Sequence, residues 1–123
     1  MKIGDTFLGA LPGETRHLWV VITTPNDQNE VVIVNLTSRP CDETCRIQAG
    51  EHPFVKKPTV VRYQDARLCS ISLLEIACKK NLFLAHQPVS EDLLRRIQEG
   101  ALKSEFTPGK VVREVRRVIP DQG

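Results

Sequence analysis

The sequence predicts a small α+β domain that is mainly β in its first half and carries short helices in its second. Two observations predict this class: short β-branched runs separated by turn and loop residues recur up to residue 63, and from residue 72 the apolar positions recur at helical spacing. The 123 residues suffice for one hydrophobic core but would leave two cores marginal. We therefore expect a single domain, residues 1–123, built on a small antiparallel sheet that curls like a barrel.

Three strands are predicted in the first third of the chain. An apolar stretch over 3–11 ends at Pro12-Gly13, a dipeptide typical of turns, and the dense run LWVVI over 18–22 follows. The run VVIVNLT over 31–37 is apolar almost throughout, which indicates a central strand covered on both faces. The polar residues 26–29 predict a hairpin between the second strand and the third.

The middle of the chain predicts a long loop, one more strand and a short helix. Residues 39–58 hold three prolines and a glycine without a sustained period, so we expect loops there. A fourth strand is expected over 59–63. Ser72 is the expected N-cap of a helix over 73–78 that stops near Asn81, and a further short strand is expected over 82–84.

Two helices are predicted in the last third. Ser90 caps a helix over 91–99, where acidic residues in the first turn suit the helix dipole and leucines and an isoleucine define one apolar face. After it, Thr107 is the expected N-cap and Pro108 the first residue of a terminal helix, because valines and an isoleucine recur at helical spacing over 111–119. The whole pattern fits a barrel of the SH3-like type with C-terminal helices.

Charge and hydropathy exclude some functions and leave others open. Seventeen Lys and Arg against 15 Asp and Glu give a net charge of +2, which permits a nucleic-acid ligand without requiring one. Arginines concentrate in the last third of the chain. No apolar run approaches the roughly 20 residues that cross a bilayer, and the N-terminus lacks the layout of a signal peptide. We expect a cytoplasmic protein that does not use the membrane.

The four cysteines leave a metal site open as an alternative. Without an export signal, reduced thiols are expected rather than disulfides. Cys41 and Cys45 are separated by three residues, within the range of structural zinc sites, and His52 follows seven residues later. Cys69 could supply the fourth ligand, but Cys69 and Cys78 do not form the second tight pair that is typical of a zinc ribbon. The alternative interpretation places Cys41 and Cys45 in a polar loop and Cys78 in the core.

Four stretches, taken in order, resemble the MazF/PemK/Kid family of toxin endoribonucleases from bacterial toxin-antitoxin pairs. These are Gly4-Asp5, His17–Thr23, Val31–Ser38 (VVIVNLTS) and Lys57–Arg62 (KPTVVR). The resemblance covers residues 3–104 and leaves 105–123 as a C-terminal extension. It implies an SH3-like barrel of the MazF/PemK type, a homodimer, an antitoxin protein as partner, and cleavage of single-stranded RNA without a metal or other cofactor.

The chemistry of RNA cleavage can be matched to three neighbouring residues. The ribose 2′-hydroxyl must lose a proton, the phosphorane must have its extra charge held, and the leaving 5′-oxygen must gain a proton. A histidine can exchange a proton near neutral pH, an arginine can hold phosphate oxygens, and a threonine hydroxyl can donate a further hydrogen bond. His17, Arg16 and Thr37 are our candidates, because a hairpin would bring the start of one strand beside the end of the next.

A second group is predicted to bind the RNA. Ser38, His52, Arg62 and Tyr63 are the candidates. Arg62 would pair with a phosphate, and Tyr63 or Phe54 would stack on a base.

Two alternatives remain open at this point. The resembled family has Arg-Pro where this chain has His17-Leu18, and the segment from Cys41 to Phe54 is not part of the usual pattern. A catalytically silent barrel that binds a protein or a nucleic acid is therefore the second hypothesis, and a zinc-stabilised module built on Cys41, Cys45 and His52 is the third. Phosphate loops of the P-loop or dinucleotide type are excluded, because no glycine-rich strand-loop-helix segment exists.

Overall fold

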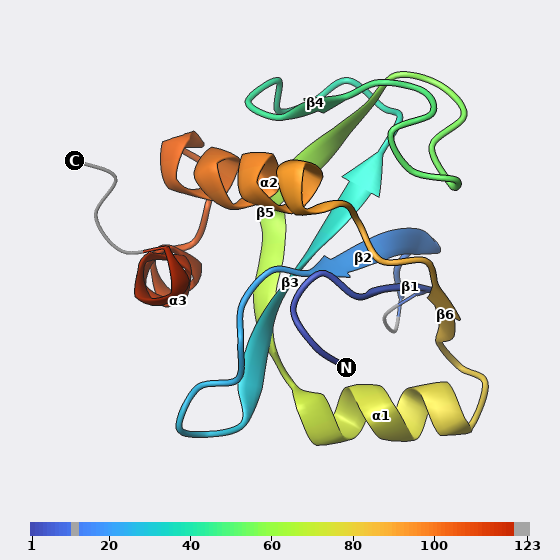
Figure 1. The fold of residues 1–123 in the computed structure, drawn as a ribbon, viewed down its shortest axis with the longest axis vertical. Coiled ribbons are helices and arrows are strands. Elements are labelled where there is room, and N and C mark those ends of the chain that lie inside the picture. The colour runs from blue at the N-terminus through green and yellow to red at the C-terminus, as the bar shows by residue number, and fades with distance from the viewer. Residues whose placement is uncertain (11–12, 120–123) are drawn as a thin grey trace.

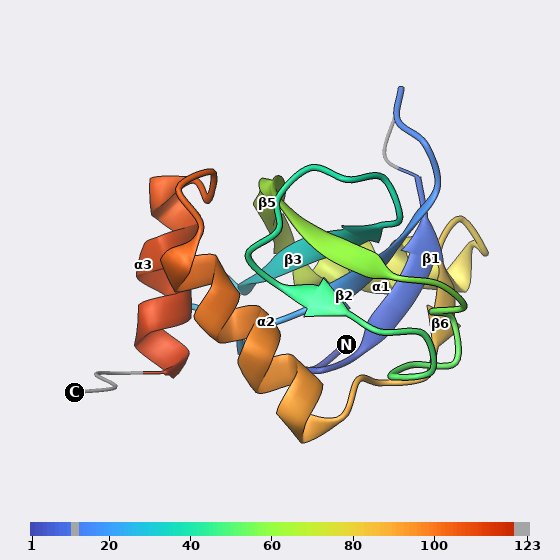
Figure 2. The same cartoon turned by 90° about the horizontal axis from the view of Figure 1, so that it is seen from above.

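The computed structural model describes residues 1–10 and 13–119, which form a mixed α+β unit (Figure 1). The elements follow in the order β1 (Thr6–Gly9), β2 (His17–Val21), β3 (Glu30–Thr37), β4 (Arg46–Ile47), β5 (Thr59–Ser70), α1 (Ile71–Lys79), β6 (Leu84–His86), α2 (Glu91–Lys103) and α3 (Gly109–Val118). The strands form one antiparallel sheet in the order β4-β5-β3-β2-β1-β6. The sheet curls into a half-barrel, so the coarse fold class predicted from the sequence is confirmed (Figure 2).

The sheet has a core on each face, because alternate residues of each strand point to opposite sides. Leu18 and Val20 of β2 belong to the core that α2 and α3 cover with residues such as Ile97 and Val115. Trp19 lies on the other face, in a core that α1 covers. Figure 1 shows α1 on one side of the sheet and α2 on the other. β3 runs between β2 and β5 with all but its first residue buried, which confirms the predicted central strand.

The β2–β3 hairpin forms where it is predicted. The Asn26 amide donates to the Glu30 carbonyl at 3.0 Å, and Asn29 takes a left-handed conformation with a φ of 59°. Asparagine tolerates this region better than most residues, so it closes the turn at little cost. The predicted first strand is shorter than expected and ends at Gly9, while Leu11 and Pro12, where its end was predicted, lie outside the described residues.

The fourth predicted strand is longer than expected. β5 continues to Ser70 rather than ending near residue 63, because it pairs with the whole length of β3 across an irregularity between Ile33 and Asn35. α1 follows without a loop. Its N-cap is therefore Ser70, whose hydroxyl accepts from the Leu73 amide, and not Ser72. The long loop over 39–58 also contains a two-residue strand, β4, against the start of β5.

Two further boundaries differ from the prediction. The short strand β6 begins at Leu84 instead of residue 82, because the amides of Leu82 and Phe83 both donate to the Ala77 carbonyl and close the end of α1. α3 begins at Gly109 and not at Pro108. Pro108 has an extended backbone and occupies the N-cap position, and Thr107 supplies no side-chain cap.

The C-terminal helix belongs to the folded core although it lies beyond the expected barrel of residues 3–104. α2 meets the prediction closely, with Ser90 accepting from the Leu93 amide at 3.1 Å. α3 packs against α2 and buries Val111 and Val115 in the same core. Residues 120–123 of the expected extension lie outside the described residues. Within the described ranges, no helix is long and apolar enough to cross a membrane.

Candidate functional site

A basic cleft of about 450 Å³ opens where β2 begins and β3 ends. Its lining includes four cationic side chains, which are Arg16, Arg39, Lys56 and Lys57. No carboxylate of residues 1–10 or 13–119 lines the cleft or pairs with any of these four cations. Unpaired cations around one hollow create a positive potential that attracts phosphate groups.

His17 and Thr37 lie side by side in this cleft. β2 and β3 run antiparallel with Leu18 opposite Leu36, so the next pair outward sets His17 opposite Thr37 on the same face of the sheet. The β2–β3 hairpin therefore brings these two residues together, as the sequence predicts. Arg16 precedes His17 and is exposed at the same cleft.

The His17 ring has one nitrogen tied to the backbone. Its Nδ1 lies 3.2 Å from the Leu36 carbonyl oxygen, which can only accept a hydrogen bond. Nδ1 therefore carries the proton and donates, and in the neutral ring Nε2 is left with its lone pair. A carbonyl that fixes the tautomer in this way also fixes the orientation of the ring, which is what a general base needs.

The Thr37 hydroxyl is set up as a donor. The Arg39 amide donates to Thr37 Oγ1 at 3.1 Å, which occupies a lone pair of the oxygen and leaves the hydroxyl proton free. Thr37 is buried, and it lines the cleft together with Ser38. The turn after β3 thus presents a hydroxyl donor beside the His17 ring.

One wall of the cleft is the end of the long loop, and Phe54, Val55, Lys56 and Lys57 form it. His52 holds this wall in place through two hydrogen bonds to backbone groups. Its Nδ1 accepts from the Phe54 amide at 3.0 Å, and its Nε2–H donates to the Gln87 carbonyl at 2.6 Å. Both ring nitrogens are used, and the side chain is only 2% exposed. His52 thus supports the cleft from behind, whereas its predicted role was to touch RNA.

Arg96 of α2 holds the same loop in place at Arg46 and Glu51. It pairs with Glu51 and donates to the Arg46 carbonyl at 2.7 Å. The hydrogen bond from the Arg96 guanidinium holds the pKa of the Glu51 carboxyl below its usual range. Further back, Asp42 accepts from the Ser104 hydroxyl at 2.5 Å. The loop over 39–58 is therefore anchored to the middle of α2 and to its C-terminal end.

Phe54 is the aromatic side chain that the cleft exposes. It is 40% exposed, and its ring meets the edge of His86 with centroids 5.8 Å apart. Tyr63, the other predicted stacking residue, is fully buried and donates its hydroxyl to the Ile97 carbonyl at 2.7 Å. Its ring offers no face to a base. Gly100 of α2 makes room for the Tyr63 side chain, because a Cβ at this position would collide with the Tyr63 hydroxyl.

Arg62 lies one row from the cleft on the same face of the sheet. It stands opposite Asn35 of β3, two residues before Thr37, and its Nε lies 3.2 Å from Asp65. Asn35 donates to the same carboxylate at 3.2 Å, while its Oδ1 is buried without a partner among the described residues. Arg62, Asn35 and Asp65 thus form a polar row beside His17 and Thr37.

The proposed zinc ligands do not meet. In the described part of the chain no group of three His, Cys, Asp or Glu side chains could hold a metal ion. Cys41 is exposed, Cys45 is buried, and His52 uses both ring nitrogens for backbone groups. Burial raises the pKa of the Cys45, Cys69 and Cys78 thiols, so none of these three is an activated nucleophile.

The sequence did not reveal Arg39, Lys56 and Lys57 as site residues. The dipeptide Lys56-Lys57 stands just before the strand that carries the family resemblance, and Arg39 follows Ser38, so their proximity to candidate residues was an available signal. The sequence does not show the path of the loop over 39–58. The loop returns across the end of β3, and only this return brings the two lysines next to Arg39.

No protein-family model and no curated protein sequence matches this chain. The family membership suggested by the resemblance therefore stays a prediction.

Proposed function

We propose that the chain is a metal-independent endoribonuclease that cleaves single-stranded RNA in the basic cleft. The observation that carries the proposal is the grouping of His17, with a lone pair on Nε2, and the Thr37 hydroxyl among four cations that pair with no carboxylate of the described residues. A phosphodiester placed there meets a base, a hydrogen-bond donor and positive charge at once. The base removes the proton of the 2′-hydroxyl, and the donor and the cations hold the charge of the phosphorane. These are two of the three requirements of RNA cleavage, and water meets the third by protonating the leaving 5′-oxygen.

The proposed reaction uses groups that the chain itself supplies. Nε2 of His17 takes the proton of the 2′-hydroxyl, whose oxygen attacks the adjacent phosphorus. Arg16 and the Thr37 hydroxyl hold the non-bridging oxygens as charge builds up on them. The bond from phosphorus to the 5′-oxygen then breaks, and that oxygen takes a proton from water in the open cleft. The hydroxide left behind takes the proton that Nε2 of His17 accepted, which restores the neutral ring. The products are a 2′,3′-cyclic phosphate and a 5′-hydroxyl.

The RNA is held by contacts outside the reacting atoms. Arg39, Lys56 and Lys57 would neutralise flanking phosphates, Ser38 would add a hydrogen bond, and an unpaired base would stack on Phe54. Arg62 would extend the phosphate contacts along the sheet face. The requirement for an exposed base face and a flexible backbone favours single strands over a duplex.

The biological setting of the proposal comes from the resemblance. We propose an SH3-like barrel of the MazF/PemK type that acts in the cytoplasm as the toxin of a toxin-antitoxin pair, as a homodimer that an antitoxin protein neutralises. An antitoxin that covers the cleft would have to present carboxylates to its four cations.

The deciding experiment is incubation of the purified protein with mixed-sequence single-stranded RNA in EDTA, followed by sequencing of the fragment ends. We expect discrete cuts that carry cyclic phosphates and that disappear in His17→Ala. Lys79→Ala on α1, far from the cleft, is the matched surface control. RNA that is bound but left whole by folded protein would refute cleavage and favour the silent binding barrel.

A further inference from the structure

The positive charge of this protein is concentrated in a second place, the C-terminal helix. α3 carries four cations and a single carboxylate, a net charge of +3, whereas the whole chain carries +2. All residues outside α3 together are therefore net negative by one charge. A ten-residue helix that exceeds the net charge of its whole protein creates a strong local positive potential.

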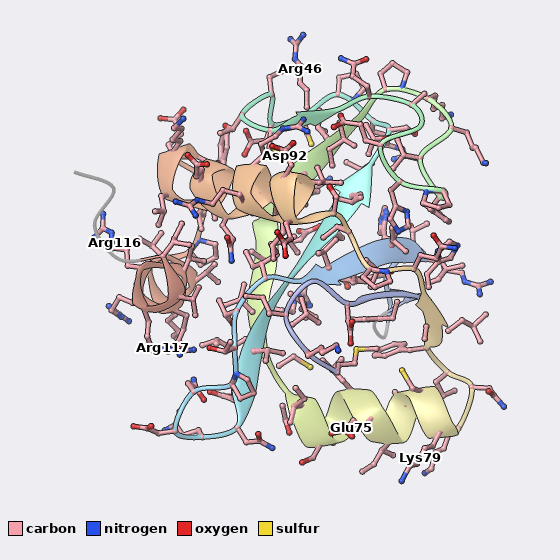
Figure 3. The ribbon with its side chains drawn as sticks, viewed as in Figure 1. Arg46, Glu75, Lys79, Asp92, Arg116 and Arg117 are labelled. Carbon is pink, nitrogen blue, oxygen red and sulfur yellow. The ribbon has the colours of Figure 1, made fainter. Side chains whose placement is uncertain are left out.

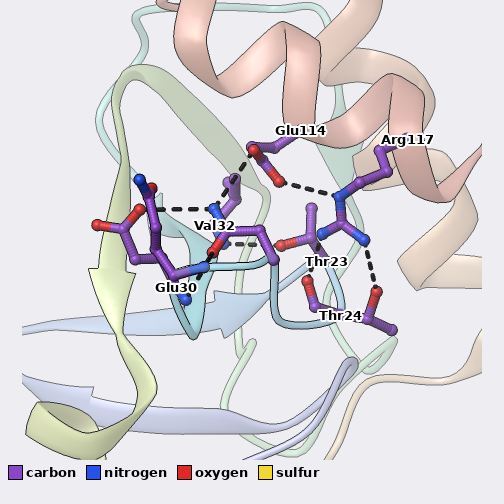
Figure 4. A network of polar contacts seen from close by, with 8 residues as sticks. Thr23, Thr24, Glu30, Val32, Glu114 and Arg117 are labelled. Atoms are coloured by element: carbon purple, nitrogen blue, oxygen red, sulfur yellow. Dashed lines mark hydrogen bonds and ion pairs between the residues drawn. The ribbon is translucent and has the colours of Figure 1, made fainter.

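Two of the charged side chains of α3 hold the helix in place. Arg117 donates to the Thr24 carbonyl at 2.6 Å and pairs with Glu114 at 3.1 Å (Figure 4). Glu114 also accepts from the Asn26 side chain at 3.4 Å. These contacts tie α3 to the β2–β3 hairpin and use up the single acidic side chain of the helix. They need no external ligand.

The other three cations, Lys110, Arg113 and Arg116, are exposed, and within residues 1–10 and 13–119 no carboxylate pairs with them. Their spacing of three residues spreads them over about 120° of the helix surface. The middle of that arc lies opposite the buried residues Val111 and Val115. Figure 3 shows Arg116 directed away from the sheet. The outer side of α3 is thus a purely cationic surface.

An exposed aromatic ring adjoins this surface in the chain. Phe106, four residues before Lys110, is 52% exposed. A protein partner is usually anchored by apolar side chains at the centre of the contact, and the arc from Lys110 to Arg116 presents none. A nucleic-acid backbone needs only cations, and an unpaired base can stack on an aromatic side chain. The composition therefore favours a single-stranded nucleic acid.

We propose that Lys110, Arg113, Arg116 and Phe106 form a second binding surface for single-stranded RNA, separate from the cleft. This α3 surface lies near the start of β3, where Gln28 and Glu30 line a hollow with Lys110, whereas the cleft lies at the end of β3. Eight residues of strand separate the two by about 23 Å. Given the proposed function, the α3 surface holds a part of the substrate that the cleft does not reach, so long RNA binds more tightly than short RNA.

The test compares two double charge reversals in the His17→Ala background, which keeps the RNA whole. Arg113→Glu with Arg116→Glu alters the α3 surface. Lys79→Glu with Lys80→Glu, at the C-terminal end of α1, makes the same change in net charge on the helix that covers the other core of the sheet. Binding of labelled oligonucleotides of about 6 and about 30 nucleotides is measured against salt concentration, and circular dichroism with thermal melting verifies folding.

We expect the α3 reversal to weaken binding of the long RNA about tenfold and to lower its salt slope by about 1.4, since two phosphate contacts are lost. The α3 reversal should change binding of the short RNA by less than about twofold. The α1 control should change binding of either RNA by less than about twofold. Phe106→Ala should weaken binding of long single-stranded RNA and leave binding of duplex RNA unchanged. Equal effects of the two reversals would show a mere change in net charge and would overturn the inference.

Separate readouts distinguish this inference from the proposed function. If the wild-type protein cleaves RNA and the α3 reversal acts like the α1 control, the endoribonuclease stands and the α3 surface is refuted. If cleavage is absent but the α3 reversal weakens long RNA selectively, the α3 surface stands alone. If a poly-glutamate peptide binds the α3 surface and long RNA does not, an acidic protein is the partner and the inference is wrong.

Discussion

The Nδ1 atom of His17 donates to the backbone carbonyl of Leu36, 3.2 Å away on the neighbouring strand. The donor belongs to the first residue of β2 and the acceptor to the penultimate residue of β3, so the sheet itself fixes the tautomer. This contact leaves Nε2 as the basic nitrogen at the cleft. It also separates two roles of His17, orientation through Nδ1 and proton transfer through Nε2, which can be tested independently.

His17→Asn separates these roles. An asparagine amide keeps a donor near the position of Nδ1 but offers no basic nitrogen, so the contact with Leu36 can survive while proton transfer is lost. We expect cleavage to fall by at least about 100-fold and the melting temperature to stay close to that of the wild type. Single-turnover assays measure the cleavage rate, and differential scanning calorimetry measures the melting temperature. An active His17→Asn protein would remove His17 from the base role.

The hydroxyl of Thr37 is tested by Thr37→Ser against Thr37→Val. Serine keeps an oxygen that accepts from the Arg39 amide and a proton that can be donated, whereas valine keeps only the shape. We expect Thr37→Ser to retain cleavage and Thr37→Val to lose about tenfold or more in the rate constant of the chemical step. Equal rates for the two variants would show that Thr37 is only a buried strand end.

Glu51→Gln should change the pH dependence of stability. The hydrogen bond from Arg96 lowers the pKa of Glu51 in the folded state from its usual value of 4.5, so the unfolded state takes up the proton more readily. The contact therefore stabilises the fold fully above pH 4.5 and is lost as the pH falls through the lowered value. We expect Glu51→Gln to cost about 1 kcal/mol at neutral pH and less in acid.

Urea unfolding of wild type and Glu51→Gln between neutral and acidic pH measures this difference. Glu43→Gln is the control, because Glu43 pairs with Arg46 at an exposed position and such pairs contribute little. A difference between wild type and Glu51→Gln that stays constant through the acidic range would contradict the pairing.

Tyr63 and Gly100 should be energetically coupled. Tyr63→Phe loses a buried hydrogen bond to Ile97 and should cost about 1 kcal/mol. Gly100→Ala should destabilise the fold although alanine favours helices by about 1 kcal/mol, because the new Cβ collides with the Tyr63 hydroxyl. Removing that hydroxyl takes away the closest contact of the new Cβ and leaves the tight contacts with the Tyr63 ring and Cys45 at 3.0 and 3.1 Å. The double variant should therefore cost at least about 0.5 kcal/mol less than the sum of the single ones, measured by urea unfolding.

α3 is predicted to be part of the cooperative unit. Val115→Ala removes buried methyl groups at a fully buried position and should lower the free energy of unfolding by about 1–3 kcal/mol. Val112→Ala, at a half-buried position on the same helix, should cost less than half as much. Chemical unfolding followed by tryptophan fluorescence reports both, because Trp19 lies in the sheet. Equal and negligible effects would mean that α3 does not fold with the sheet.

Much of the fold could be predicted because it is encoded in short stretches. The apolar run over 31–37 identified the central strand, residues 26–29 identified the hairpin, and Ser90 identified the start of α2. The neighbourhood of His17 and Thr37 followed from the hairpin. Propensity, capping and strand alternation act over a few residues, so a linear pattern contains them.

Elements that depend on a distant partner could not be predicted in this way. β5 runs to Ser70 because β3 offers it pairing groups over that length, although Arg62 and Asp65 give its sequence a polar character. α1 consequently begins at Ile71 with Ser70 as its cap, two residues before the Ser72 that was the expected cap. The local signals were present at these positions, but pairing across the sheet outweighed them.

The sequence by itself determined the α+β class, the central strand, the hairpin and the pairing of His17 with Thr37. Only the tertiary structure decided whether the other candidate residues reach the cleft or are buried in the fold. Tyr63 became a core residue because Gly100, 37 positions later, leaves room for its ring, and His52 became a structural tie because Gln87 offers it a carbonyl. Burial and hydrogen-bond partners of a side chain are set by segments far away in the chain, and no local pattern contains them.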